Sequence, residues 1–351
     1  MLIRIKGVKR VVAKGHEYFY HRKTMTRLPG RPGTTEFMDA LTELDRIAAD
    51  QAEALPGTLG ALLAAYRSSP EFLSLADRTR QDYRRIFDLL QPVDRLSLSR
   101  IDRALIYEMR DRIFAKHKRR WANYTLQILR SIFNWAKRRG LIETNPAADV
   151  ELIRRPRNAA TVNRPWTDAE AITVMKAASP PLRVAIALGL YLGLRKGDVL
   201  RAPWSAYDGT GFSLRQAKTG EPLWLPVHHD LRAILDAAPR TSPVIVVGVA
   251  GKPYAQNGFQ SLFAKLIRKL KTAGQVGDGL TFHGLRHTVG KRLAEAGCDA
   301  RTIAAILGHR TSTMAEHYSR DAERKHLARE GMAKLDQSLR KTPPKSRRKT
   351  P

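Results

Sequence analysis

The stretch "VAIALGLYLGLRKGDVL", residues 184–200, decides the architecture around it. Its first eleven residues carry no charge, and a run of that length is too short to span a bilayer, so it predicts a helix buried in a protein core. The helix ends at Gly193, and Arg195 follows closely. An arginine at the end of such an apolar helix is costly unless an anion or a carboxylate meets it. Asp198, three residues on along one helical face, could hold Arg195 in one orientation, and an ordinary surface ion pair is the alternative.

A hairpin is predicted after this helix. The segments "GFSLRQAK" and "PLWLPVH" alternate apolar and polar residues as strands do, and Thr219-Gly220 joins them. Lys218 therefore lies near the tip of the hairpin. A lysine at a turn usually serves solubility, but one at a mobile tip can also be lowered into a groove.

The stretch "TFHGLRHTVGKRLAEAG", residues 281–297, predicts a further helix with polar candidates near its start. Thr281 is a possible cap, and His283 and Arg286 lie one helical turn apart on a common face. The histidines of the chain do not form a recognisable zinc site, because there is no HExxH motif and no cysteine partner.

The segment at 301–318 adds two more candidates, His309 and Tyr318. An apolar helix, a turn at Gly308 and a polar second helix favour a DNA-reading helix-turn-helix when this segment is considered alone. A surface loop and half of an active site are the other interpretations. The choice depends on the rest of the chain.

The charge of the chain narrows the class of partner. There are 62 Lys and Arg against 33 Asp and Glu, which gives a formal net charge of +29 on 351 residues. Such a field favours a polyanionic partner. The length exceeds one ordinary core and predicts two or three domains, which 43% hydrophobic residues are enough to fill.

The single cysteine, Cys298, can form neither an internal disulfide nor a Cys-based zinc site, which fits a reducing compartment. The amino-terminal stretch "MLIRIKGVKR" lacks the apolar core of a signal peptide. We therefore expect a cytoplasmic, nucleoid-associated bacterial protein with no membrane role.

The amino-terminal part is strongly basic, with nine basic side chains and one acid, Glu17, between Arg4 and Arg31. An alternating pattern around Lys14-Gly15 predicts a hairpin, and a helix with an apolar face starts near Thr34. This module either contacts DNA or packs as an embellishment on the next domain, and the pattern favours both equally.

From 58 to 150 the pattern is helical, and Gly140 is a normal helix stop. Its many basic side chains suit phosphate contacts, although any one of them is more often a solvated surface charge. Residues 152–165 are basic, contain proline and predict a tether that lets two domains close around a duplex. The capping box Thr167–Glu170 then opens a new helix.

These patterns together predict a multidomain, mainly helical chain with small β elements, of the α+β class. The predicted parts are an amino-terminal basic module, a helical DNA-binding domain, a linker, a mixed catalytic domain, and a helix end with a disordered basic tail. Their predicted boundaries are 1–56, 57–151, 152–165, 166–333 and 334–351.

An ordered set of six residues carries a resemblance. Gly-Leu-Arg, a hairpin lysine, His-x-x-Arg, Leu-Gly-His and a tyrosine resemble the catalytic signature of the tyrosine recombinase (phage integrase) family. In this chain the six are Arg195, Lys218, His283, Arg286, His309 and Tyr318. The resemblance covers residues 164–333. It extends more loosely to the helical part, which is similar to the family's core-binding domain, and to the amino-terminal module, which resembles an arm-site-binding domain. Asp198 stands where many relatives have glutamate.

The resemblance implies cleavage and rejoining of DNA strands through a covalent 3′-phosphotyrosine at Tyr318. It implies that both arginines bind the phosphate and that His283 assists the proton of the nucleophile. It also implies that His309 hydrogen-bonds the phosphate and that Lys218 protonates the leaving 5′ oxygen. The sequence leaves open which residue moves which proton.

No metal and no nucleotide cofactor are expected, because there is no GxxxxGK[ST] motif and no acidic cluster at metal-ligand spacing stands out. The expected partners are specific sites in double-stranded DNA and further copies of the chain. We expect a homotetramer on DNA, a monomer or weak oligomer when free, and accessory DNA-bending or directionality proteins.

Met332, Leu335 and Leu339 form one helical stripe near the carboxy terminus. In the family such a helix docks on a neighbouring protomer, and packing on its own domain is the alternative. The leading function is an integrase of a prophage or other mobile element. A chromosome-dimer resolvase, a type IB topoisomerase and a non-catalytic regulator that reads DNA with residues 301–318 are the alternatives.

Overall fold

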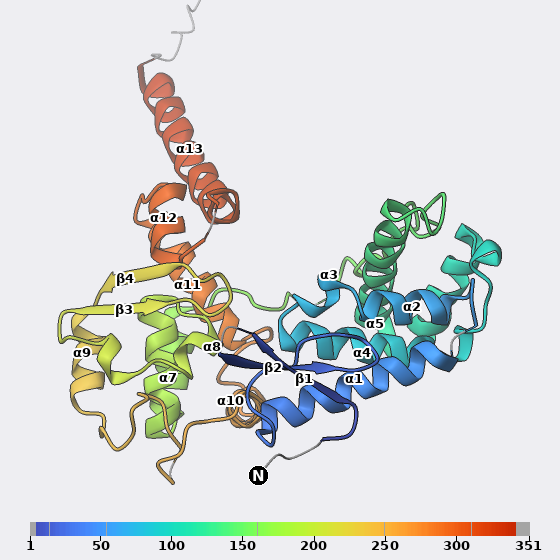
Figure 1. The fold of residues 1–351 in the computed structure, drawn as a ribbon. Coiled ribbons are helices and arrows are strands. Elements are labelled where there is room, and N and C mark those ends of the chain that lie inside the picture. The colour runs from blue at the N-terminus through green and yellow to red at the C-terminus, as the bar shows by residue number, and fades with distance from the viewer. Residues whose placement is uncertain are drawn as a thin grey trace, which may run out of the picture. The chain divides into compact units, whose positions relative to one another are not determined.

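A computed structural model describes residues 5–13, 15–53, 55–159, 161–248, 250–309 and 311–341. The chain divides into two compact units, residues 1–157 and 158–351, each of which is described here by itself. Both consist mainly of helices, and each contains one two-stranded antiparallel sheet, as expected for the predicted α+β class (Figure 1). The tail predicted to be disordered lies beyond Lys341, outside the described residues. No helix in the described ranges has the length and apolar character needed to cross a membrane.

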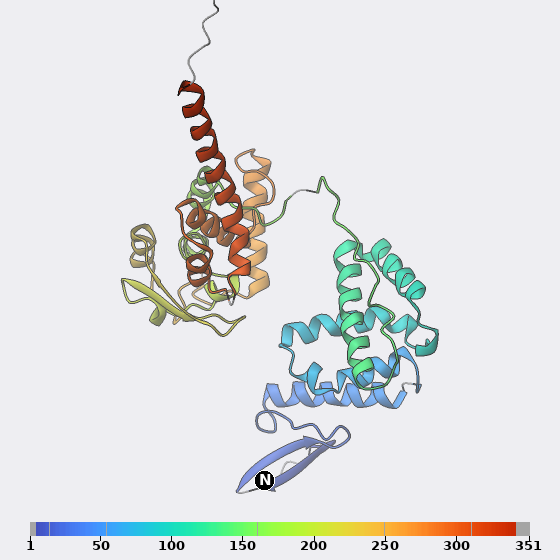
Figure 2. The same cartoon turned by 90° about the horizontal axis from the view of Figure 1, so that it is seen from above.

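The first unit begins with the predicted hairpin. Strands β1 (Val8–Ala13) and β2 (His16–His21) pair antiparallel, and helix α1 (Thr35–Glu53) follows (Figure 2). The helix starts near Thr34 as predicted, and the Thr34 hydroxyl caps it by accepting the N–H of Phe37 at 3.3 Å. This part has a small core of its own. Its buried members are Leu28, Phe37, Leu41, Leu44 and Ile47.

The remainder of the first unit is helical. Its elements are α2 (Leu59–Arg67), α3 (Pro70–Leu73), α4 (Asp77–Leu90), η1 (Gln91–Val93), η2 (Leu98–Arg100) and α5 (Arg103–Arg138). Two ion pairs hold α1 against α4: Arg84 with Glu43 at 2.9 Å and Arg46 with Asp88 at 3.0 Å. The amino-terminal module therefore packs on the helical part through α1.

Pro70 and Lys118 interrupt the helical part. Pro70 starts α3, and the Ser69 hydroxyl caps it by accepting the N–H of Phe72, so residues 59–73 form two helices. The range of α5 consists of two helices on either side of a break at Lys118, whose φ is 64°.

The second unit surrounds the apolar helix α7. Its elements are α6 (Asp168–Ala177), α7 (Pro180–Leu192), α8 (Lys196–Val199), η3 (Trp204–Ala206), β3 (Gly211–Arg215), β4 (Pro222–Pro226), α9 (His229–Asp236), α10 (Gln256–Thr272), α11 (Phe282–Glu295), α12 (Ala300–Leu307) and α13 (Thr313–Lys341). Residues 184–190 of α7 are all buried, as the uncharged run predicts. Gly189 lets α11 approach α7 closely, because a Cβ there would lie 2.9 Å from a methyl carbon of Leu285.

The segment that enters the second unit is fixed to the start of α11. The Thr281 hydroxyl donates to Asn163 at 2.7 Å, and the backbone N–H of Trp166 donates to the Thr288 hydroxyl at 2.8 Å. The predicted capping box at Thr167 and Glu170 is present. Residues 161–166 therefore line one side of α11.

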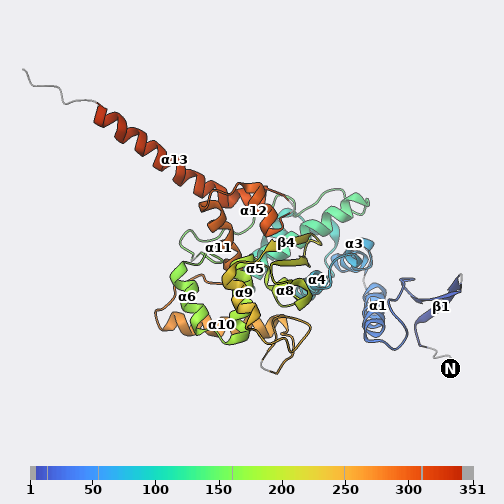
Figure 3. The same ribbon diagram turned by 90° about the vertical axis from the view of Figure 1, so that its left-hand side faces the viewer.

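Helix α13 extends well beyond its neighbours α11 and α12 (Figures 1 and 3). Met332 and Leu335 are 60% and 47% exposed. The alternative that these two side chains pack on their own domain is therefore wrong. The side chain of Leu339 is outside the described part.

Candidate active site

Arg286 of α11 is the most deeply buried of the predicted site residues. Its side chain reaches the ends of two other helices: Nη1 donates to the carbonyl oxygen of Gly193 at 2.9 Å, and Nη2 donates to that of Leu307. Gly193 ends α7 with a φ of 62°, a conformation that favours glycine. Burial and then the charge of Arg195 lower the pKa of Arg286 to about 10.

Gln216 links Arg286 to the second predicted arginine. Arg195 donates from Nη1 to Oε1 of Gln216, and Nε2 of Gln216 donates to the Leu307 carbonyl at 3.1 Å. That carbonyl thus accepts from both Gln216 and Arg286. Gly308 makes the approach of the Gln216 amide possible, since a Cβ at this position would lie 2.1 Å from Nε2. The two guanidinium groups are therefore held together at the ends of α7 and α12.

Neither guanidinium has a carboxylate partner within 4.0 Å in the described part of the chain. The predicted contact between Asp198 and Arg195 is wrong. The chain leaves the helix at Gly193, and Arg195 is extended (φ −68°, ψ 146°) as the residue before α8, so the two side chains do not share a helical face. Asp198 instead accepts the N–H of Ala217 at 2.9 Å and lies 3.6 Å from Arg201.

Lys218 lies in the turn of the β3–β4 hairpin, as predicted, and its side chain is exposed. Gly220 closes the turn with a φ of 73° and donates its N–H to the Gln216 carbonyl at 2.8 Å. Asp198 fixes the residue before Lys218 through the Ala217 N–H. The carboxylate therefore positions the base of the hairpin.

The predicted histidines lie close to these cations. Desolvation, followed by the charges of Arg286, Arg195 and Lys218, lowers the pKa of His283. Burial, followed by the charges of the same two arginines, lowers the pKa of His309 to about 4. Nδ1 of His309 is buried and has no hydrogen-bond partner among the described residues. Both rings are therefore neutral at pH 7 and are able to accept or donate one hydrogen bond at each nitrogen.

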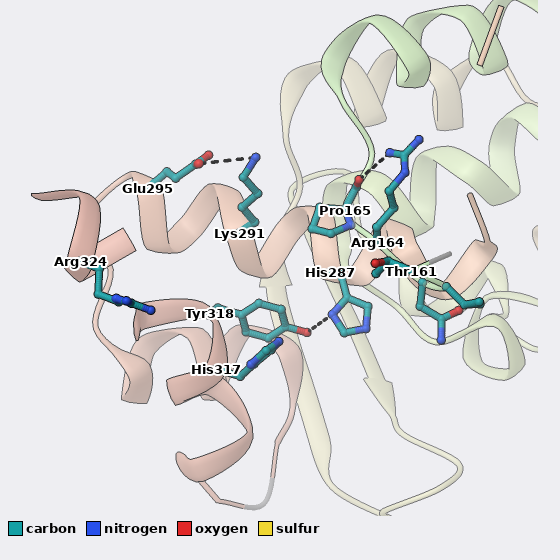
Figure 4. A pocket seen from close by; sticks show the side chains of 11 residues that line it. Thr161, Arg164, Pro165, His287, Lys291, Glu295, His317, Tyr318 and Arg324 are labelled. Atoms are coloured by element: carbon teal, nitrogen blue, oxygen red, sulfur yellow. Dashed lines mark hydrogen bonds and ion pairs between the residues drawn. The ribbon is translucent and has the colours of Figure 1, made fainter. Parts of the chain in front are cut away.

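Tyr318 of α13 is half-buried against α11 (Figure 4). Its hydroxyl lies 2.9 Å from Nδ1 of His287, and its ring covers Gly290. Burial raises the pKa of Tyr318, and the charge of Arg286 acts in the opposite direction. The helix-turn-helix pattern is present as α12, Gly308 and α13, but the Tyr318 side chain packs inward on α11 rather than lying on an exposed recognition surface.

A cavity of about 640 Å³ borders Tyr318. Its wall includes residues 161–165 on one side and Lys291, Glu295 and His317 on the other (Figure 4). The tyrosine ring is thus confined by α11 and open towards this cavity.

The structure brings the six predicted residues into one region of the second unit, linked by the contacts and charges given above. Sequence reasoning missed Gln216, His287 and Gly290. Gln216 stands two residues before Lys218 in the predicted hairpin, and His287 directly follows Arg286, so both lay inside stretches that the sequence had already marked.

One group of described residues has the spacing of metal ligands: His228, His229 and Asp230, all exposed at the start of α9. None of these side chains belongs to the arginine cluster. Around that cluster, the described residues include no group of three ligands with metal-binding spacing.

Comparisons with known proteins place this sequence and fold among recombinase-like relatives. Residues 166–325 match the model described as "Phage integrase family". This match covers most of the second unit. Over 207 residues the chain is 28% identical to the integrase of Enterobacteria phage 434, covering 56% of this chain and 57% of that protein. The chain is also 29% identical over 217 residues to the tyrosine recombinase XerC of Rhodospirillum centenum, covering 57% of this chain and 61% of that protein.

These alignments span about three fifths of the length of the relatives. A lambda integrase tetramer bound to a Holliday junction is similar to this chain in fold, with a TM-score of 0.64 and 19% identity. That match covers 88% of this chain and 97% of the lambda chain.

Proposed function

We propose that the protein is a site-specific DNA recombinase that cuts and rejoins strands through a covalent 3′-phosphotyrosine at Tyr318. The observation that carries the proposal is the pair of neighbouring guanidinium groups, Arg195 and Arg286, with no carboxylate partner in the described structure. Two adjacent cations at least partly removed from water are unfavourable unless an anion joins them. A DNA phosphate has the charge and the oxygen geometry that they require.

The chemistry needs fixed positive charge more than it needs a cofactor. When a phenol oxygen attacks a phosphodiester, negative charge develops on the non-bridging oxygens, and positioned cations stabilise it. The O–P bond to Tyr318 forms as the bond to the 5′ oxygen breaks. The phosphotyrosyl bond retains the free energy of the broken bond, so a second 5′ hydroxyl reverses the step and joins a different strand without ATP.

Each remaining group has a place in this scheme. Arg195 and Arg286 hold the non-bridging oxygens, and His309 adds a hydrogen bond to the phosphate through a ring nitrogen. Lys218, on its exposed turn, gives a proton to the leaving 5′ oxygen. His283 stands beside the two arginines and assists the proton of the nucleophile. Asp198 supports Lys218 through the Ala217 N–H.

The proposed partner is double-stranded DNA carrying a specific recombination site, which the net charge of +29 favours. On DNA the chain assembles as a homotetramer. The exposed apolar side chains of α13 supply a surface for a neighbouring copy. The similarity to a lambda integrase tetramer bound to a Holliday junction supports this assembly.

Within this class we propose an integrase of a mobile element. The basic hairpin and α1 precede the helical part, which favours an integrase with an additional DNA contact over a shorter chromosome-dimer resolvase. Accessory DNA-bending or directionality proteins belong to the same proposal.

The test uses nicked suicide substrates built from the DNA that flanks the gene. The wild-type chain should give a covalent protein–DNA adduct, whose mapping identifies the site, the nucleophile and the polarity. Tyr318→Phe should abolish the adduct and leave DNA binding in a gel-shift assay unchanged. An adduct that persists at full yield in Tyr318→Phe contradicts the proposal.

Two further assays separate the alternatives. A type IB topoisomerase relaxes a supercoiled plasmid without pairing two sites, whereas a recombinase exchanges strands between two sites in one reaction. A non-catalytic regulator forms no adduct, and Tyr318→Phe would leave its function intact.

A further inference from the structure

We infer that His287 is the residue that positions the Tyr318 hydroxyl, by accepting its hydrogen at Nδ1 and thereby fixing the direction of the attacking oxygen. The inference rests on the proposed function, because it assigns a new role in the same site. His287 is not one of the six residues of the family signature. The resemblance to that family implied that His283, not His287, assists the proton of the nucleophile.

The geometry favours His287 over His283. The two residues are four apart on α11, and their rings meet edge to face with centroids 5.0 Å apart. His287 lies between His283 and Tyr318, with its ring centroid 5.6 Å from that of the tyrosine. Within the described residues, the Tyr318 hydroxyl forms its hydrogen bond with Nδ1 of His287, at 2.9 Å. Desolvation and then the charges of Arg286, Arg195 and Lys218 lower the pKa of His283, which makes no hydrogen bond to Tyr318 in the described part.

The surroundings explain why such a restraint is needed. The cavity of about 640 Å³ leaves the phenol room to turn away from α11. Gly290 supports the ring from below, since a Cβ there would lie 2.9 Å from three ring carbons. The glycine lets the ring lie close to α11, and among the described residues the hydrogen bond to His287 restrains the hydroxyl at the end of the ring (Figure 4).

The protonation state of His287 fits the role of an acceptor. Burial, followed by nearby His283, His317 and Arg286, lowers the pKa of His287 to about 4, so the ring is neutral at pH 7. A neutral imidazole with its proton on Nε2 offers the Nδ1 lone pair to the phenol hydrogen. Such a ring is too weak a base to remove the phenol proton on its own, which is why we assign it positioning rather than proton removal.

The first test measures the single-turnover rate of adduct formation at saturating DNA. His287→Ala should reduce the rate about 10- to 100-fold, an effect typical of lost orientation at a reacting atom, without weakening DNA binding. His287→Asn should restore the rate to within about fivefold of wild type, because the amide oxygen replaces Nδ1 as an acceptor although it cannot act as a base. A wild-type rate in His287→Ala, or an equally slow rate in both variants, overturns the inference.

His317→Ala is the matched control. His317 lines the same cavity, and its ring lies 5.9 Å from that of Tyr318, but it makes no hydrogen bond to the hydroxyl. The single-turnover rate of the His317→Ala variant should stay within about twofold of wild type. A loss equal to that of His287→Ala would assign the effect to the cavity wall and overturn the inference.

Nitrogen-15 NMR of the histidine side chains tests the hydrogen bond in the free protein, without any DNA. His287 should be the neutral tautomer with an unprotonated Nδ1, whose signal shifts in Tyr318→Phe. A protonated Nδ1, or a signal insensitive to this change, contradicts the inference. If the wild type forms no adduct with any DNA, the proposed function fails, and the NMR result still decides the contact.

Discussion

Two arginine clusters in the second unit have opposite electrostatic surroundings. Arg164 pairs with both carboxylate oxygens of Glu170 and donates to the carbonyl of Asp278. Its hydrogen bond to Glu170 lowers the pKa of the carboxylate to about 2 and raises that of Arg164. Among the described residues, Arg286 donates to two carbonyl oxygens, and burial followed by the charge of Arg195 lowers its pKa to about 10.

The difference shows what each cluster is for. The first is complete: its charge is neutralised, and the carboxylate also caps α6 and accepts the N–H of Gly277 at 3.1 Å. The second has an excess of positive charge that no carboxylate within 4.0 Å neutralises in the described part of the chain. A complete ion pair contributes to the stability of the unit, whereas an unneutralised pair of guanidinium groups is suited to bind an anion.

The largest effect should come from Arg286→Ala. We expect a loss of adduct formation of at least about 10³-fold, because removing a single donor that stabilises developing negative charge costs about 10²- to 10³-fold and Arg286 also carries a full charge. The single-turnover rate with a suicide substrate measures it. A fully folded Arg286→Ala variant with more than a tenth of the wild-type rate would remove Arg286 from the phosphate site.

Substitution in the Arg164–Glu170 cluster should change the stability of the second unit rather than the rate of adduct formation. Glu170→Ala removes the partner of Arg164 and the cap of α6, and we expect a loss of about 2–4 kcal/mol in the free energy of unfolding of the second unit. Chemical denaturation followed by circular dichroism measures this value.

Asp168→Ala is the control for that measurement. Asp168 pairs with Arg292 at the start of the same helix, but its side chain is 82% exposed. An exposed pair contributes at most about 1 kcal/mol. Equal losses in the two variants would show that burial does not distinguish the two ion pairs.

Inorganic phosphate probes the unneutralised cluster directly. A ligand that binds only the folded state stabilises it, and a site with a dissociation constant near 10 mM would contribute about 1.4 kcal/mol at 100 mM phosphate. The melting temperature of the wild type should therefore rise with phosphate more than with sodium chloride at equal ionic strength. Arg195→Ala should lose this difference, and an unchanged difference would place the anion elsewhere.

Local sequence patterns predicted the elements that carry the site. The Thr281 cap, the hairpin turn near Lys218 and the glycine at the end of α7 each depend on neighbours within a few residues, and the structure confirms them. The Asp198 prediction failed because it assumed that Arg195 and Asp198 share one helical face, whereas Arg195 is the extended residue before α8. The left-handed turn at Gly193 ends the helix and rotates Arg195 away from the carboxylate.

The missed residues depend on distant partners. Gln216 acts through the carbonyl of Leu307, 91 positions away, and no local pattern predicts that contact. His283 and His287 lie on the same face of α11, so periodicity alone does not tell which of them meets the tyrosine. Only the packing of α13 on α11 makes that choice.

The smallest effect should come from Gly290→Ala, which separates stability from chemistry at one position. Gly290 lies inside α11, where alanine favours the helix by up to about 1 kcal/mol. Its methyl group would overlap the Tyr318 ring, so the ring must move. We expect unchanged or slightly higher thermal stability together with a roughly tenfold slower adduct formation. If instead stability falls and the rate is preserved, the tyrosine ring is not held where α11 places it, and the orientation of the nucleophile is set by the DNA alone.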